Sequence, residues 1–117
     1  MFFWTPWAPL TREQVAKLSD VPGLYEVKVD GRNPVPYPSG KSAMVFYGFT
    51  DDRKSLRLAL EEDWFSPAKD AIRAQWSEKH GALVFRWAAT PDPRPEHDRR
   101  MRTFIERFGR FPWGNAD

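Results

Sequence analysis

The chain has 117 residues and a formal net charge of +2, and this length predicts one domain built around a single core. The absence of cysteine excludes disulfides, thiolate zinc sites, iron–sulfur clusters and a cysteine nucleophile, and it fits a reducing compartment. No segment has the roughly 20 apolar residues that a membrane helix needs, and the start lacks the basic region of a signal peptide, so we expect a cytoplasmic protein without a membrane partner.

The first half of the chain alternates strand-forming runs with turn signals. Thr11 begins a capping-box pattern that predicts a helix over residues 12–18. Residues 24–29 are rich in strand formers and end at an Asp-Gly turn signal, so they predict a strand. Residues 30–42 are rich in proline and glycine, which is typical of a loop, and the apolar run 43–49 predicts a second strand. We expect the two strands to pair as an antiparallel hairpin with a long connection.

The second half of the chain reads as helix, helix, strand and helix. Apolar residues at four-residue steps predict a helix over 54–64. A Ser-Pro start predicts another helix, which Gly81 ends. Residues 82–88 predict a third strand, and an apolar stripe beyond a proline-rich loop predicts a last helix that ends at Gly109.

This order of elements predicts an α/β domain of the α+β type, in which helices flank a small three-stranded antiparallel sheet. We expect a single domain over 1–117, with residues 1–20 as an N-terminal extension carrying a short helix and 21–115 as the core. The tryptophans in the proline-punctuated ends are expected to cover this core rather than bind a ligand: Trp4, Trp7 and Trp113.

Charge is distributed unevenly along the chain. Residues 94–110 hold six arginines against Glu96, Asp98 and Glu106, a net charge of +3, whereas residues 51–63 have a net charge of −2. A basic C-terminal helix suits contact with phosphates. A solvated helix face explains the same charges, and the sequence leaves both interpretations open.

Familiar motifs for nucleotide or metal binding are incomplete. Residues 40–42, Gly-Lys-Ser, resemble the end of a phosphate-binding P-loop, but Val35 stands where that loop needs its first glycine, and the segment leads into a strand instead of a helix. The histidines lack metal-ligand spacing, and the neighbouring acids on the helices point in different directions. We therefore predict no metal site from these groups: His80, His97, residues 61–63 and residues 96–98.

A set of short motifs resembles the GIY-YIG nuclease superfamily over about residues 20 to 115. Gly23-Leu24-Tyr25 after Pro22 is similar to the first triplet of that family, and Phe46-Tyr47-Gly48 is similar to the second. The resemblance implies a GIY-YIG-like fold, with both triplets on one β-hairpin. The following helix and the tail add to it: Leu56-Arg57, then Phe104-Ile105, Pro112 and Asn115.

The resemblance implies a catalytic pair, Tyr25 and Arg57, if the chain is active. A tyrosine near the attacking water can take part in proton transfer, and an arginine fork can hold phosphate oxygens. The family also uses a divalent ion on a glutamate, so Mg²⁺ or Mn²⁺ would be the cofactor of an active enzyme.

Three positions depart from the family pattern. Phe46, without a hydroxyl, replaces the second tyrosine, and Met101 replaces the metal-binding glutamate. Asp98, one helical turn earlier, is the nearest carboxylate that could reach inward. Arg57 matches the family arginine if one residue is inserted after the second strand; otherwise that position falls on Ala59.

Three functions follow as hypotheses. The first is a GIY-YIG-like module that has lost cleavage and binds nucleic acid, DNA rather than RNA. The second is a divergent metal-dependent endonuclease, and the third is a protein-interaction domain anchored by exposed aromatic residues. Phosphate contacts in the first are expected from four basic residues: Lys54, Arg57, Arg99 and Arg102.

Overall fold

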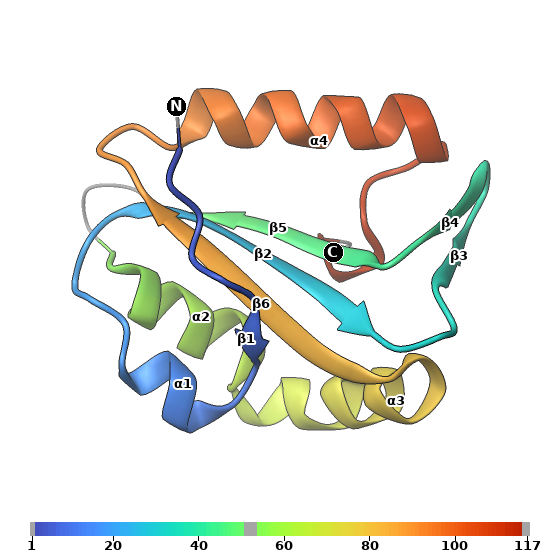
Figure 1. The fold of residues 1–117 in the computed structure, drawn as a ribbon, viewed down its shortest axis with the longest axis horizontal. Coiled ribbons are helices and arrows are strands. Elements are labelled where there is room, and N and C mark those ends of the chain that lie inside the picture. Colours follow the sequence, from blue (N-terminus) through green and yellow to red (C-terminus); the bar gives the residue numbers. More distant parts are fainter. Residues whose placement is uncertain (1, 51–53, 116–117) are drawn as a thin grey trace.

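A computed structural model describes residues 2–50 and 54–115 of the chain (Figure 1). Four strands form one antiparallel sheet in the order β1-β6-β2-β5, and a separate two-stranded antiparallel sheet pairs β3 with β4. The α+β class and the antiparallel sheet flanked by helices are therefore as predicted. The strands are β1 (Ala8–Pro9), β2 (Gly23–Asp30), β3 (Val35–Tyr37), β4 (Gly40–Ser42), β5 (Met44–Phe49) and β6 (Ala82–Ala89).

Strand β2 is the centre of the large sheet. It pairs with β5 on one side and with β6 on the other, so the predicted hairpin between the first two long strands is confirmed. Successive residues of a strand point to opposite faces. Tyr25 and Val27 therefore share one face of the sheet, and Leu24, Glu26 and Lys28 share the other. Seven of the eight residues of β2 are buried or half-buried, because both faces are covered.

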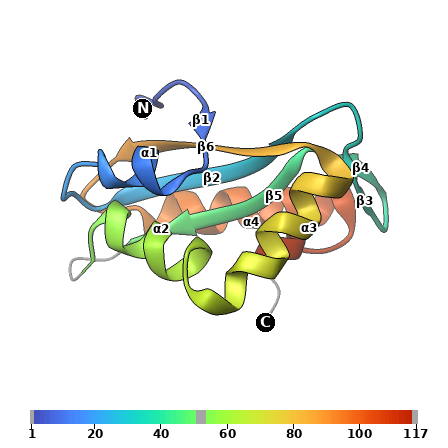
Figure 2. The ribbon, with the colours of Figure 1, turned by 90° about the horizontal axis from the view of Figure 1, so that it is seen from below.

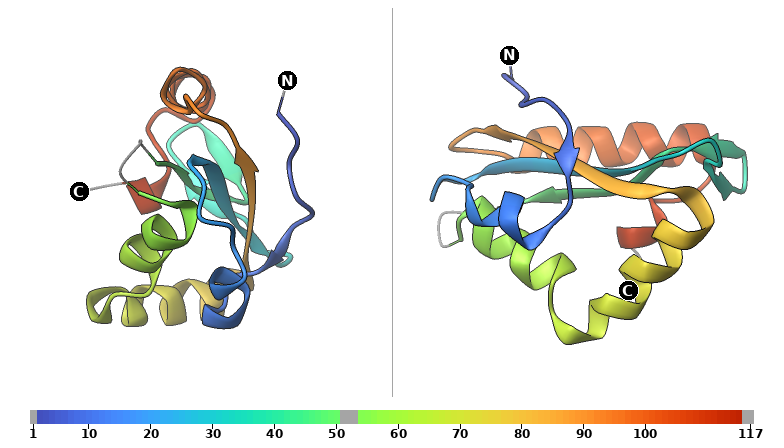
Figure 3. Two further views of the ribbon diagram at one scale, coloured as in Figure 1. Left: turned by 90° about the vertical axis from the view of Figure 1, so that its left-hand side faces the viewer. Right: turned by 60° about the horizontal axis from the view of Figure 1, so that its bottom comes forward.

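Helices lie on both sides of this sheet. The small helix α1 (Arg12–Ala16), α2 (Leu56–Trp64) and α3 (Asp70–His80) lie in front of it in Figure 2, and α4 (Arg94–Phe108) lies behind. Side-chain contacts assign the faces: Trp64 of α2 packs on Phe46, whereas Phe104 of α4 packs on Tyr47, the next residue of β5. Figure 3 shows the same separation from two further directions.

The structure differs from the predicted sheet in two places. The sheet has four strands instead of three, because Ala8 and Pro9 form β1 and pair with β6. The segment 30–42 is more than a loop, because it contains the β3–β4 hairpin. Tyr37 anchors that hairpin to the rest of the fold, since its ring meets Phe104 edge-on and its hydroxyl donates to the carbonyl of Met44.

The predicted helices are present, with local differences at their ends. Thr11 and Ser55 cap α1 and α2 through their side-chain oxygens. Ser66 makes no such capping bond, and Pro67–Lys69 form a 3₁₀ turn before α3 begins. Gly109 ends α4 in the left-handed conformation, with φ of 88°, which glycine adopts without steric strain.

The N-terminal segment is part of the packed structure. Leu10, Val15 and Leu18 belong to the same buried cluster as the residues of β2 and α2. Trp4 and Trp7 lie over the other face of the sheet, where their rings stack on arginine and lysine side chains. Among the described residues, no helix is long and apolar enough to cross a membrane.

Candidate anion-binding site

Tyr25 lies in the interior, on the sheet face covered by α2. Tyr25 is only 1% exposed to solvent. Its ring stacks on that of Phe46, with 5.5 Å between the ring centroids, and its hydroxyl donates a hydrogen bond to the carboxylate of Asp63. Burial, and then the negative charge of Asp63, raise the pKa of Tyr25 well above its usual value. The neighbouring Trp64 indole has a smaller effect and lowers the pKa of Tyr25. The indole N–H of Trp64 makes no hydrogen bond to any of the described residues. The phenol is therefore enclosed and directed at an acid.

Asp63 gives a pH-dependent contribution to stability. Burial raises its pKa above 3.8, partly opposed by the hydrogen bond from Tyr25. Because the folded carboxyl holds its proton more tightly than the unfolded one, its contribution to stability is present at low pH and is lost as the pH rises through its folded pKa. We expect Asp63→Asn, which keeps an acceptor for Tyr25, to gain stability relative to wild type as the pH rises above about 4, measured by urea unfolding. Asp20→Asn, at an exposed acid, is the control variant.

Arg57, which is predicted to act with Tyr25, lies on α2, and Lys54, which is predicted to contact phosphates, lies just before that helix. Arg57 is exposed on the outer side of the helix, whereas Leu56 and Leu60 face the core. Lys54, just before the helix, pairs with Glu62 at 2.6 Å. The structure thus does not bring Arg57 to the Tyr25 hydroxyl, and it places Lys54 and Arg57 across the sheet from α4, where the other two predicted phosphate ligands lie.

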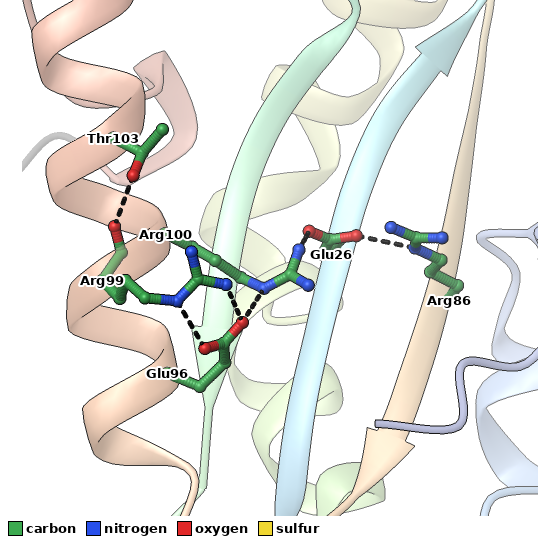
Figure 4. A network of polar contacts seen from close by, with 6 residues as sticks. All are labelled: Glu26, Arg86, Glu96, Arg99, Arg100 and Thr103. Atoms are coloured by element: carbon green, nitrogen blue, oxygen red, sulfur yellow. Dashed lines mark hydrogen bonds and ion pairs between the residues drawn. The ribbon is translucent and has the colours of Figure 1, made fainter. Parts of the chain in front are cut away.

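A network of charged side chains crosses the opposite face of the sheet (Figure 4). Its centre is Glu26 of β2, which is 1% exposed. One carboxylate oxygen accepts a bond from Arg86 Nε of β6 at 2.6 Å, and the other accepts from Arg100 Nη1 of α4 at 2.8 Å. A buried carboxylate is stable only when it is paired in this way. Glu26 therefore ties α4 to the two central strands.

Glu96 extends this network of charged side chains along α4. It accepts bonds from Arg99, three residues on, and from Arg100 Nε at 2.8 Å. The hydrogen bond from Arg99 is the main reason that the pKa of Glu96 falls to about 2. Thr103 donates its hydroxyl to the Arg99 carbonyl at 3.0 Å. Figure 4 shows Arg100 between the two acids, Glu26 and Glu96, so its position is fixed from both sides.

The N-terminal segment covers two arginines of this network, Arg86 and Arg100. The ring of Trp4 lies 4.5 Å from the Arg86 guanidinium and 4.8 Å from that of Arg100, and Trp7 lies 4.8 Å from Arg86. A backbone bond from Thr5 to the Trp87 carbonyl holds the segment beside β6. These contacts add cation–π stabilisation and restrict the guanidinium groups further.

A pocket of about 260 Å³ opens beside this network, between α4 and β5. Three arginines line it, Arg99, Arg100 and Arg107, and no acid does among the described residues. Tyr47 belongs to its wall, and burial raises the pKa of this phenol to about 12, so it is protonated at neutral pH. The pocket therefore offers hydrogen-bond donors and positive charge, which suits an anionic group.

The C-terminal turn fixes the strand that carries Tyr47. The Asn115 side chain accepts from the Tyr47 backbone N–H at 3.0 Å and donates to its carbonyl at 2.9 Å. Both backbone groups at this point of the edge strand are thereby satisfied. His97 of α4 lies 3.1 Å from the same carbonyl. Tyr47 thus has a fixed place at the pocket, on the same side of the sheet as Glu26, its partner across the strands.

The structure brings together only part of the predicted basic set. Arg99 lines the pocket, whereas Arg102 is exposed and does not line it. Several residues that line or support the candidate site have no role in the sequence-based prediction. A charged residue inside a run of strand formers, Glu26, was the available signal, because a strand covered on both faces must pair such a charge. The missed residues are Glu26, Tyr47, Arg86, Arg100 and Arg107.

The described residues contain no group of three or more histidine or acidic side chains placed to hold a metal ion. Asp98 is exposed over 56% of its side chain and lies near Arg94 and His97 instead of reaching inward. Met101 lies on α4, across the sheet from Tyr25. Comparison with protein-family models, with curated proteins and with solved structures gives no significant match.

Proposed function

We propose that this chain is a GIY-YIG-like nucleic-acid-binding domain that contacts phosphates through the flank of α4 facing β5. The observation that carries the proposal is the pocket of about 260 Å³ lined by three arginines and no acid among the described residues. Arginine forks suit phosphate oxygens, and backbone phosphates supply most of the affinity of such contacts.

The arginines of this flank are held in place before any ligand arrives. Arg100 is fixed between Glu26 and Glu96, and Arg99 is bound through two nitrogens to Glu96. Arg107 has no ion pair among the described residues, so its charge is available to a ligand. Restricted side chains lose less freedom on binding, which favours affinity.

The resemblance to GIY-YIG nucleases supports a nucleic-acid partner more than it supports cleavage. Tyr25 and Phe46, where that family has its two tyrosines, stack on one face of the hairpin. However, Tyr25 is buried against Asp63, and Arg57 points to solvent from another element. No observation therefore favours the endonuclease, and the proposal is for binding alone.

An interaction module has little support from the exposed aromatic residues. Phe3 is 83% exposed, and Phe111 and Trp113 are 38% and 39% exposed. The last two both lie under the Arg110 guanidinium, so they do not form an apolar patch away from basic residues.

The experiment measures binding of a fluorescent oligonucleotide over a range of salt concentrations. We expect affinity to fall steeply with salt. In the double variant Arg99→Gln/Arg107→Gln we expect weaker binding to all sequences and a salt slope smaller by about 2, because about one unit is lost for each phosphate contact.

The control is Arg32→Gln/Arg57→Gln, which removes the same charge from exposed sites that do not line the pocket. It should leave the slope close to that of wild type. If both double variants weaken binding equally, net charge explains the binding and the α4 flank is not the site. Binding that does not change with salt would remove the proposal altogether.

A further inference from the structure

The pocket on the α4 flank has an aromatic floor beneath its arginines. Tyr47, Phe104 and Phe108 line it together with Thr103, while Arg99 and Arg107 are the exposed basic residues of its wall. Tyr47 and Phe104 meet edge-on, at 5.8 Å between ring centroids, and Phe108 packs on Phe104 at 4.6 Å. A phosphate alone would use the arginines but would gain nothing from this apolar surface.

Two hydroxyl groups in the same pocket keep hydrogen-bonding capacity for a ligand. The Tyr47 hydroxyl has no hydrogen-bond partner among the described residues, and its raised pKa, about 12, keeps it a donor at neutral pH. The Thr103 hydroxyl already donates its proton to the Arg99 carbonyl, so it can only accept a hydrogen bond from a ligand. One donor and one acceptor over an aromatic surface suit the edge and face of a nucleobase.

The size of the pocket suits a single unpaired base. Its volume of about 260 Å³ is below the range of roughly 300–1,000 Å³ that is usual for drug-sized ligands. In a duplex the bases are stacked and paired, and the phosphates lie on a convex surface that can meet the arginines but cannot fill a hollow. In a single strand a base can turn out and stack on aromatic side chains.

We infer that the pocket between α4 and β5 holds one unpaired base of a single-stranded nucleic acid, with Arg99 and Arg107 on the flanking phosphates. This inference rests on the proposed function and narrows its substrate class from nucleic acid to single strands. No covalent step is involved.

The test compares three labelled ligands of equal length by fluorescence anisotropy: a single strand, its duplex, and an abasic strand with the same sugars and phosphates. We expect the single strand to bind about 5- to 150-fold more tightly than the abasic strand, the range for one base stacked on an aromatic side chain. We expect the duplex to bind more weakly than the single strand at the same salt concentration.

Thr103→Trp fills the hollow while leaving the arginines in place, and we expect it to abolish the difference between normal and abasic strands. Ile105→Trp, also on exposed surface of α4 but outside the pocket, is the matched control and should keep that difference. Circular dichroism and thermal unfolding check that both variants are folded.

Each outcome separates the two proposals. Equal, salt-dependent binding of all three ligands would overturn the base pocket while leaving phosphate binding by α4 intact. An unchanged preference for the normal strand in Thr103→Trp would place the base elsewhere and also overturn this inference. If no ligand binds at low salt, both the inference and the proposed function fall.

Discussion

Replacing Arg86 and Arg100 together with methionine is expected to destabilise the fold by about 3–5 kcal/mol. The double variant leaves the Glu26 carboxylate buried at the centre of the sheet without either of its cationic partners. Breaking a buried ion pair from one side costs this much because the remaining charge is neither hydrated nor paired. Urea unfolding followed by circular dichroism measures the loss as a shift of the midpoint at constant slope.

A triple variant that adds Glu26→Leu to these two substitutions separates the cost of the unpaired buried charge from the effect of altered packing. When a whole buried ion group is replaced by apolar side chains of similar volume, stability is often unchanged or higher. We therefore expect the triple variant to recover most of the loss. Arg57→Met, on the exposed side of α2, should change stability by less than about 0.5 kcal/mol. A double variant as stable as wild type would show that water reaches Glu26 and that the pairs do not anchor α4.

The same triple variant tests why the charged group is there. A purely apolar group at this place would serve the fold, but it would not hold Arg100 at the pocket, whereas Arg99 stays bound to Glu96. We expect the recovered triple variant to bind oligonucleotides more weakly than wild type despite its stability, since Arg100 and the anchor that orders its surroundings are gone. Stability and binding are then separable on one network.

Much of the fold could be predicted because its long elements carry strong periodic signals. Four-residue steps marked α2, and a dense run of strand formers marked β2. The central hairpin followed from the two apolar runs at 24–29 and 43–49. These patterns arise because each long helix or strand buries one face along its whole length. They can therefore be recognised in the sequence without knowledge of the tertiary structure.

The elements that were missed are short and depend on tertiary contacts. β1 is two residues long and contains Pro9, so nothing local favours a strand; its pairing with β6 creates it. The β3–β4 hairpin lies among prolines, and it is held by Tyr37 against Phe104. The ion network was missed for the same reason, because its members are up to 74 residues apart in the sequence.

The alternation of strand residues also explains why the two triplets do not form one reactive site. Tyr25 and Phe46 lie on the α2 face, whereas Tyr47 lies on the α4 face beside the arginines. Tyr47, which lines the pocket, is thus on the opposite side of the sheet from the buried Tyr25. Phe46 carries no hydroxyl, and the phenol of the next residue, Tyr47, lies on the other face of the sheet.

Gly48→Ala is expected to be among the most damaging single substitutions, with a loss of about 3 kcal/mol. A Cβ on Gly48 would lie 2.7 Å from the Tyr25 hydroxyl oxygen and closer still to two ring carbons. The ring cannot move aside, because it stacks on Phe46 and is bonded to Asp63. The backbone of Gly48 has no positive φ, so the clash and not conformational strain is the cause.

A double-mutant cycle with Tyr25→Leu tests this cause, since leucine keeps much of the volume but removes the atoms that clash. We expect Gly48→Ala to cost about 2 kcal/mol less in the Tyr25→Leu background than in wild type, a coupling typical of residues in direct contact. Midpoints of urea unfolding for the four proteins give this coupling. An equal cost in both backgrounds would mean that contact with the Tyr25 ring is not the cause of the loss.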